Sequence, residues 1–243
     1  MDTADFIRLL DHEGRLLASA AELAGVDAEV PTCPEWRVGD LVEHTGRVHR
    51  WAAGFVAEGR TAPGPFPEPP GLEGGELLAW YRAGHRQLVE TLERADPALE
   101  CYHFLPARSP LAFWARRQAH ETTVHRIDAE AARGGAPSPI AADFAADGVD
   151  ELLRGFHARA KSRVRTERPR VLRVRATDTE DAVWTVRLTA EPPAAERGAT
   201  AEAECEISGP ARELYLSLWN RVPFPGVTGD ASLAELWRET SGV

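Results

Sequence analysis

The change in apolar spacing near Pro169 is the feature that most constrains how this chain folds. From Ala4 to Arg163 the apolar residues recur at helical spacing, without a clear alternating run. Beyond Pro169 apolar and polar residues alternate in three short segments, 171–175, 183–188 and 203–207. The sequence therefore predicts an α+β protein with two domains, a helical one over 1–165 and a small α+β one over 166–243.

Helical periodicity in the first domain predicts five helices, over 3–24, 38–58, 75–95, 110–133 and 142–162. The segment 61–75 holds five prolines and is predicted to be a surface connection. Four long helices with short links are typical of an antiparallel bundle. In the second domain we expect three strands of a half-buried antiparallel sheet, then helices over 211–219 and 232–239.

Composition excludes several classes of function. The net charge of −10 argues against nucleic-acid binding, which needs an excess of cations. No stretch approaches the roughly 20 apolar residues that span a bilayer, and the N-terminus lacks the apolar region of a signal peptide. Three scattered cysteines form neither a disulfide framework nor a CxxC zinc site. We therefore expect a cytoplasmic protein that does not bind membranes.

A histidine interrupts the apolar stripe of the second predicted helix. That stripe is made of Leu41, His44, Val48, Trp51 and Phe55, and it should face the interior of the bundle. On this helix alone, a core histidine satisfied by its neighbours is the favoured interpretation over a metal ligand.

The fourth predicted helix carries a more unusual polar stripe. Glu121 and His125 lie one turn apart and about 40° around the helix axis, so their side chains can converge on one ion. Asp128, one turn further, is placed to orient the His125 ring. The alternative is a solvated polar face with an ordinary surface pair, but Trp114 at one end of the stripe favours burial.

Together, His44, Glu121 and His125 would make a His₂Glu set, which is typical of catalytic zinc sites that keep a fourth position open. His49 is a weaker rival on a neighbouring stripe and the nearest candidate for a fourth ligand. Cys33 is interpreted as a packing residue of the turn that leads into the second helix.

Three segments resemble the mycothiol-dependent maleylpyruvate isomerase family: VPTCPEWRVGDLVEH (30–44), HETTVHRID (120–128) and LSLWNR (216–221). The resemblance implies a DinB-like four-helix bundle followed by a domain similar to sterol carrier proteins. It also implies a divalent metal, usually zinc, held by His44, Glu121 and His125, and mycothiol, the low-molecular-weight thiol of actinobacteria, as cosubstrate. A late arginine important for activity in the isomerase maps onto Arg221, which is otherwise equally well explained as a surface cation.

The predicted function is accordingly that of a metal-dependent enzyme with a small-molecule substrate and a thiol as its partners. The metal-activated thiolate would add across a cis double bond, the new single bond would rotate, and elimination would return the trans isomer. Transfer of the thiol to an electrophile is also open. Two further hypotheses are a hydrolase with a metal-activated water, and a non-catalytic protein whose ion is enclosed by four ligands, with His49 as the fourth.

Overall fold

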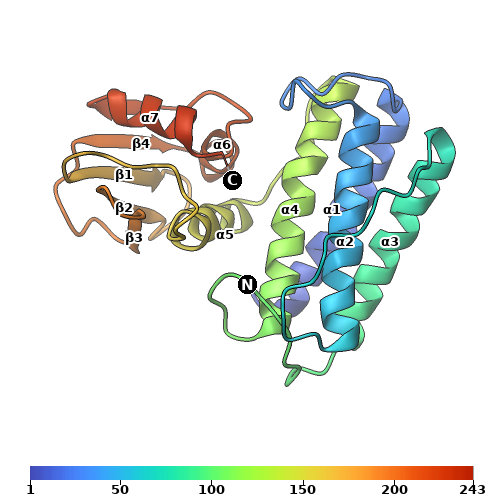
Figure 1. Ribbon diagram of the computed structural model, residues 1–243. Coiled ribbons are helices and arrows are strands. Elements are labelled where there is room, and N and C mark those ends of the chain that lie inside the picture. The colour runs from blue at the N-terminus through green and yellow to red at the C-terminus, as the bar shows by residue number, and fades with distance from the viewer. Residues whose placement is uncertain (243) are drawn as a thin grey trace. The chain divides into compact units, whose positions relative to one another are not determined.

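The computed structural model describes residues 1–242. These residues form two compact units that meet between Ser138 and Pro139 along the sequence. The first unit is a bundle of four helices (Figure 1). Their bounds are α1 (Thr3–Ala24), α2 (Val38–Glu58), α3 (Gly74–Arg94) and α4 (Pro110–Arg133). The predicted four-helix bundle is confirmed. Along residues 1–242, no helix is long and apolar enough to cross a membrane.

The ends of the bundle helices follow from local capping. Asp2 and Asp5 form a capping box that starts α1, since each carboxylate accepts the other residue's backbone N–H. Ser109 accepts the N–H of Ala112 at 3.2 Å and starts α4, with Pro110 in its first turn. Gly134, at a positive φ of 81°, ends α4.

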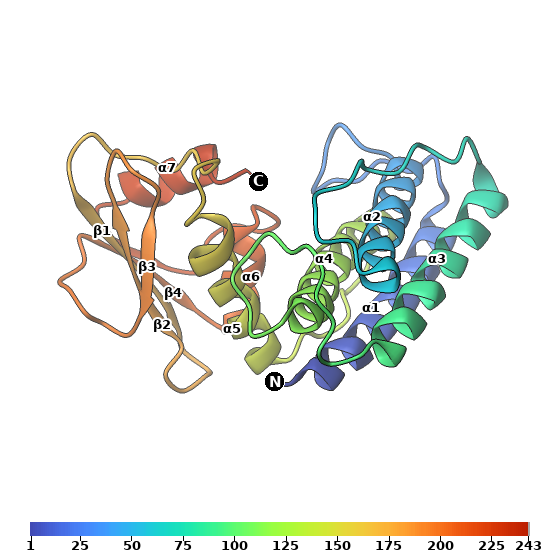
Figure 2. The same cartoon turned by 60° about the horizontal axis from the view of Figure 1, so that its bottom comes forward.

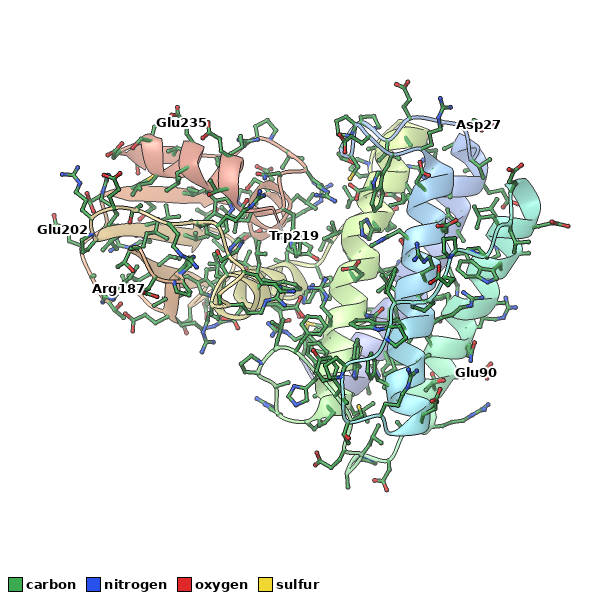
Figure 3. The ribbon with its side chains drawn as sticks, viewed as in Figure 1. Asp27, Glu90, Arg187, Glu202, Trp219 and Glu235 are labelled. Carbon is green, nitrogen blue, oxygen red and sulfur yellow. The ribbon has the colours of Figure 1, made fainter. Side chains whose placement is uncertain are left out.

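Within the bundle, α1 packs against α3 and α4, and α2 packs against the same two helices (Figure 2). The α1–α2 connection, marked by Asp27 in Figure 3, lies at one end of the bundle and carries the Pro-Thr-Cys-Pro turn. The core beneath it includes Leu17, Leu41 and Tyr81, all without exposed surface. This arrangement places the polar stripe of α4 beside α2.

The second unit is built on a five-stranded sheet with the order β3-β2-β1-β4-β5. The strands are β1 (Arg170–Ala176), β2 (Val183–Leu188), β3 (Ala194–Arg197), β4 (Cys205–Gly209) and β5 (Val227–Gly229). The expectation of three antiparallel strands was wrong, because β1 and β4 run parallel and two short strands extend the edges. After the β1-β2-β3 meander the chain returns to the other side of β1, so β4 enters in the same direction as β1.

The remaining helices also belong to the second unit: α5 (Ala142–Glu151), the π-helical turn η1 (Leu152–Phe156), α6 (Ala211–Leu218) and α7 (Ser232–Thr240). The structure thus differs from the predicted division at 165, since α5 packs against α6. Asp150 of α5 also accepts hydrogen bonds from Trp184 and Arg197 of the sheet, at 3.0 and 2.9 Å. The apolar face of α5 is therefore buried within the second unit.

A buried histidine makes the second unit sensitive to acid. His157 is 1% exposed, its Nδ1 lies 3.0 Å from Ser162 Oγ, and its ring packs edge-on against Trp237. Burial, followed by the charges of Arg159 and Arg165, lowers the pKa of His157 to about 4. The unfolded chain, with an ordinary histidine pKa near 6.5, therefore binds this proton first, and stability falls as the pH drops from 6.5 towards 4.

We expect this histidine to reduce the free energy of unfolding by about 2 kcal/mol between pH 7 and pH 5. Urea unfolding of the wild type and of His157→Gln at several pH values gives the free energy of unfolding of each protein. The contribution of His157 is the difference between the two proteins in how steeply this free energy changes with pH. Other groups, including the buried His49 and His85, titrate in both proteins and cancel in that difference. Identical slopes would contradict the assignment.

Candidate metal centre

Three side chains from α2 and α4 converge in the bundle. His44 Nε2 lies 3.4 Å from Glu121 Oε1, and His125 Nε2 lies 3.3 Å from the same oxygen. One donor atom from each residue lies within 4.8 Å of the other two. The helical stripes therefore bring together the three residues that the sequence singled out.

The spacing of these atoms fits a shared divalent ion. Two ligand atoms about 2.1 Å from a tetrahedral zinc ion lie about 3.4 Å apart. The two distances to Glu121 Oε1, 3.4 and 3.3 Å, match this separation. Two imidazoles and one carboxylate are also the donor types that zinc prefers, so the residues present fit the metal.

The His125 ring is oriented by Asp128 on the next turn of α4. Its Nδ1 lies 3.0 Å from Asp128 Oδ2, which leaves Nε2 directed at the site. Asp128 is itself held by the Pro-Thr-Cys-Pro turn, because Thr32 Oγ1 donates to Oδ1 at 2.6 Å and Cys33 Sγ lies 3.7 Å from Oδ2. Cys33 thus contacts Asp128, the residue that orients His125, as well as packing in the turn.

Glu121 is supported by Arg117, a residue that sequence analysis missed. The Arg117 Nη2 lies 3.2 Å from Glu121 Oε2, and its side chain is 3% exposed. The available signal was the spacing, since positions four apart on a helix are neighbours. Arginine is common in this chain, and that made the position hard to distinguish.

The charges around the site favour a cation. Burial opposes ionisation of Glu121, but hydrogen bonds with His125 and His44 and the charge of Arg117 hold its pKa well below the ordinary value. Burial also works against a charged His125, yet Asp128 and Glu121 raise its pKa to about 9. A proton and a metal ion compete for the same anionic surroundings, so metal binding should release protons.

Aromatic rings border the exposed side of the site. The His44 side chain is 34% exposed and that of His125 is 10% exposed, so the site opens on the His44 side. The Trp36 ring lies 5.0 Å from His44 and stacks on His125 at 5.8 Å. Phe66, from the proline-rich connection, lies 6.3 Å from the His44 ring. These aromatic neighbours were not anticipated from the sequence.

Comparison with protein families accounts for most of the chain. The family model for the mycothiol maleylpyruvate isomerase N-terminal domain matches residues 7–130. The chain belongs to the mycothiol maleylpyruvate isomerase family. The family's C-terminal domain matches residues 143–236, which includes α5 from its second residue on and agrees with the division observed in the structure.

Solved structures with the same fold include the mycothiol-dependent maleylpyruvate isomerase, at 13% identity and a TM-score of 0.67. A variant of that enzyme with a histidine replaced by alanine matches at 12% identity and the same TM-score. Both matches cover 95% of this chain and 94% of the other. Comparison with curated proteins found no match.

His49, considered as a fourth ligand, lies outside the group of donor atoms found in residues 1–242 of this family member. Its side chain is fully buried, and its Nε2 lies 2.9 Å from Thr122 Oγ1. Burial, followed by the charge of His85, lowers the His49 pKa well below its ordinary value. His49 is therefore a buried core residue of α2 that stands apart from the three candidate ligands.

Arg221 belongs to the second unit of this family member. It follows Trp219, the residue at the end of α6 that is labelled in Figure 3, and its Nη1 donates to the Trp219 carbonyl at 2.8 Å. Arg221 is partly buried, and this hydrogen bond fixes the position of its guanidinium. A role for Arg221 in substrate binding stays a prediction.

Proposed function

We propose that this protein is a divalent-metal-dependent enzyme that uses mycothiol to isomerise a maleylpyruvate-like cis-enoate or transfers the thiol to a related electrophile. The convergence of His44, Glu121 and His125 carries the proposal, because each histidine Nε2 lies at a distance from Glu121 Oε1 that suits two ligands of one zinc ion. Family membership supports the choice of mycothiol as the thiol and of a maleylpyruvate-like substrate. The cytoplasm, where small thiols stay reduced, is the compartment that suits this chemistry.

The residues of the centre have distinct tasks in this proposal. His44, Glu121 and His125 would hold the ion, while Asp128 keeps the His125 Nε2 directed at the position between them. A bound zinc ion stabilises the thiolate form of a coordinated thiol, and thereby supplies a nucleophile at neutral pH. A His₂Glu set with three protein donors leaves room for that sulfur.

The reaction balances without any other reagent. The thiolate forms a C–S bond to one alkene carbon, and the electron pair of the double bond moves onto the conjugated carbonyl. Rotation about the resulting single bond follows, after which the electron pair re-forms the double bond in the trans geometry and the thiolate leaves. A guanidinium that binds the substrate carboxylate bidentately would hold one end during rotation, and we assign this task to Arg221.

The proposal is tested by assaying the zinc-loaded protein against cis-enoates and other electrophiles, each with and without mycothiol. We expect conversion only with both the thiol and the metal, because the thiolate is the nucleophile and the ion maintains it. Protein treated with a chelator should be inactive and recover on addition of zinc. Conversion that does not depend on the thiol would instead favour metal-activated hydrolysis.

A further inference from the structure

Arg117 places a buried positive charge beside the candidate metal centre. It lies one turn before Glu121 on α4, and its side chain is 3% exposed. A guanidinium does not lose its proton in proteins, so this group is a permanent cation. Burying a charge is costly unless it is paired, and Arg117 donates through Nη2 to the carboxylate of Glu121.

The two oxygens of Glu121 face different groups. Oε2 accepts from Arg117 at 3.2 Å, whereas Oε1 lies 3.4 Å from His44 Nε2 and 3.3 Å from His125 Nε2. A carboxylate without such a partner can rotate and offer both oxygens to an ion. We propose that Arg117 is a positioning residue of the metal centre, which holds Oε2 so that only Oε1 stands beside the two histidine nitrogens. This inference rests on the metal centre proposed above.

The charge of Arg117 has a second consequence for the thiol. Two neutral imidazoles and one carboxylate cancel only one of the two charges of a divalent ion. The guanidinium draws electron density from that carboxylate and adds one positive charge in a largely buried environment. Arg117 therefore offsets part of the negative charge that Glu121 and the nearby Asp128 bring to the centre, which favours an anionic sulfur there.

The test uses Co²⁺ as a spectroscopic probe of the full-length protein. We expect Arg117→Met to weaken Co²⁺ binding about 10- to 100-fold, the range typical of partners that orient metal ligands. Arg117→Lys should recover part of the affinity, because lysine restores the positive charge but lacks the planar guanidinium with its fixed N–H donors. The absorption bands of bound Co²⁺ should also change in both variants, since the carboxylate is freed to bind differently.

A double-mutant cycle shows whether Arg117 acts through Glu121. In a Glu121→Gln background, Arg117→Met should have little further effect on Co²⁺ affinity. Arg126→Met is the matched control, because Arg126 is an equally buried arginine of α4 paired with carboxylates away from the centre, Glu13 and Glu130. It should lower stability while the folded protein keeps its Co²⁺ affinity.

The outcomes separate this inference from the proposed function. If the wild-type protein fails to bind Co²⁺ or Zn²⁺, the metal centre itself is refuted. If the wild type binds and Arg117→Met binds equally well, or is weakened no more than Arg126→Met, only the role of Arg117 is overturned. Should Arg117→Met not fold, Arg117→Lys decides the question, and unchanged affinity and spectrum would contradict the inference.

Discussion

Replacing His44 or His125 with alanine is expected to abolish stoichiometric zinc binding. Each change removes one of the three donor atoms that lie within 4.8 Å of one another. The loss should exceed the roughly 10- to 100-fold effect of partners that only orient a ligand. Thiol-dependent conversion should fall to background in both variants, because the thiolate is no longer maintained at neutral pH.

Elemental analysis of protein purified without chelator measures this effect directly, with about one divalent ion per wild-type chain as the reference. His49→Gln is the matched control, since His49 lies on the same helix but bonds to Thr122. It should retain the ion even if the fold is weakened. Full metal content in His44→Ala and His125→Ala would refute the centre, and loss in His49→Gln would favour a closed, four-ligand site.

The sequence predicted the candidate ligands unevenly. Glu121 and His125 follow from helical spacing, because residues four apart share a face whatever the rest of the fold does. His44 lies on another helix, and only the arrangement of α2 beside α4 brings it to that pair. Arg117 and Phe66 were missed for different reasons. The spacing of Arg117 from Glu121 did not distinguish it in a chain rich in arginine, and an aromatic in a proline-rich connection has no predictable neighbour.

The fold shows the same division between local and long-range information. The bounds of α1 and α2 agree with the prediction, since capping and periodicity are encoded within each helix. Alternation reveals a strand but not its direction, so the parallel pairing of β1 with β4 could not be inferred. The strands β3 and β5 have four and three residues and no buried side chain, which is too little pattern to detect.

A large effect on stability is expected where Arg126 joins three segments of the bundle. Its side chain is fully buried, with Nε 2.7 Å from Glu13 Oε2 on α1 and Nη1 2.7 Å from Glu130 Oε2. Nη1 also donates to the Ser138 carbonyl at 3.0 Å, and Ser138 in turn donates to Glu130. The network ties α4 to α1 and to the segment that follows α4.

Arg126→Met should lower the free energy of unfolding by about 3–5 kcal/mol, because it leaves the buried carboxylate of Glu13 without its cation and that of Glu130 with the more distant Arg133, 4.0 Å away. Burial then raises the pKa of Glu130, which Ser138 and Arg126 otherwise hold below its ordinary value. Urea unfolding followed by far-ultraviolet circular dichroism measures the change. Adding Glu13→Gln to Arg126→Met should restore part of the loss, since one buried charge is removed. A loss below about 1 kcal/mol for Arg126→Met would place this network among weakly contributing ion pairs.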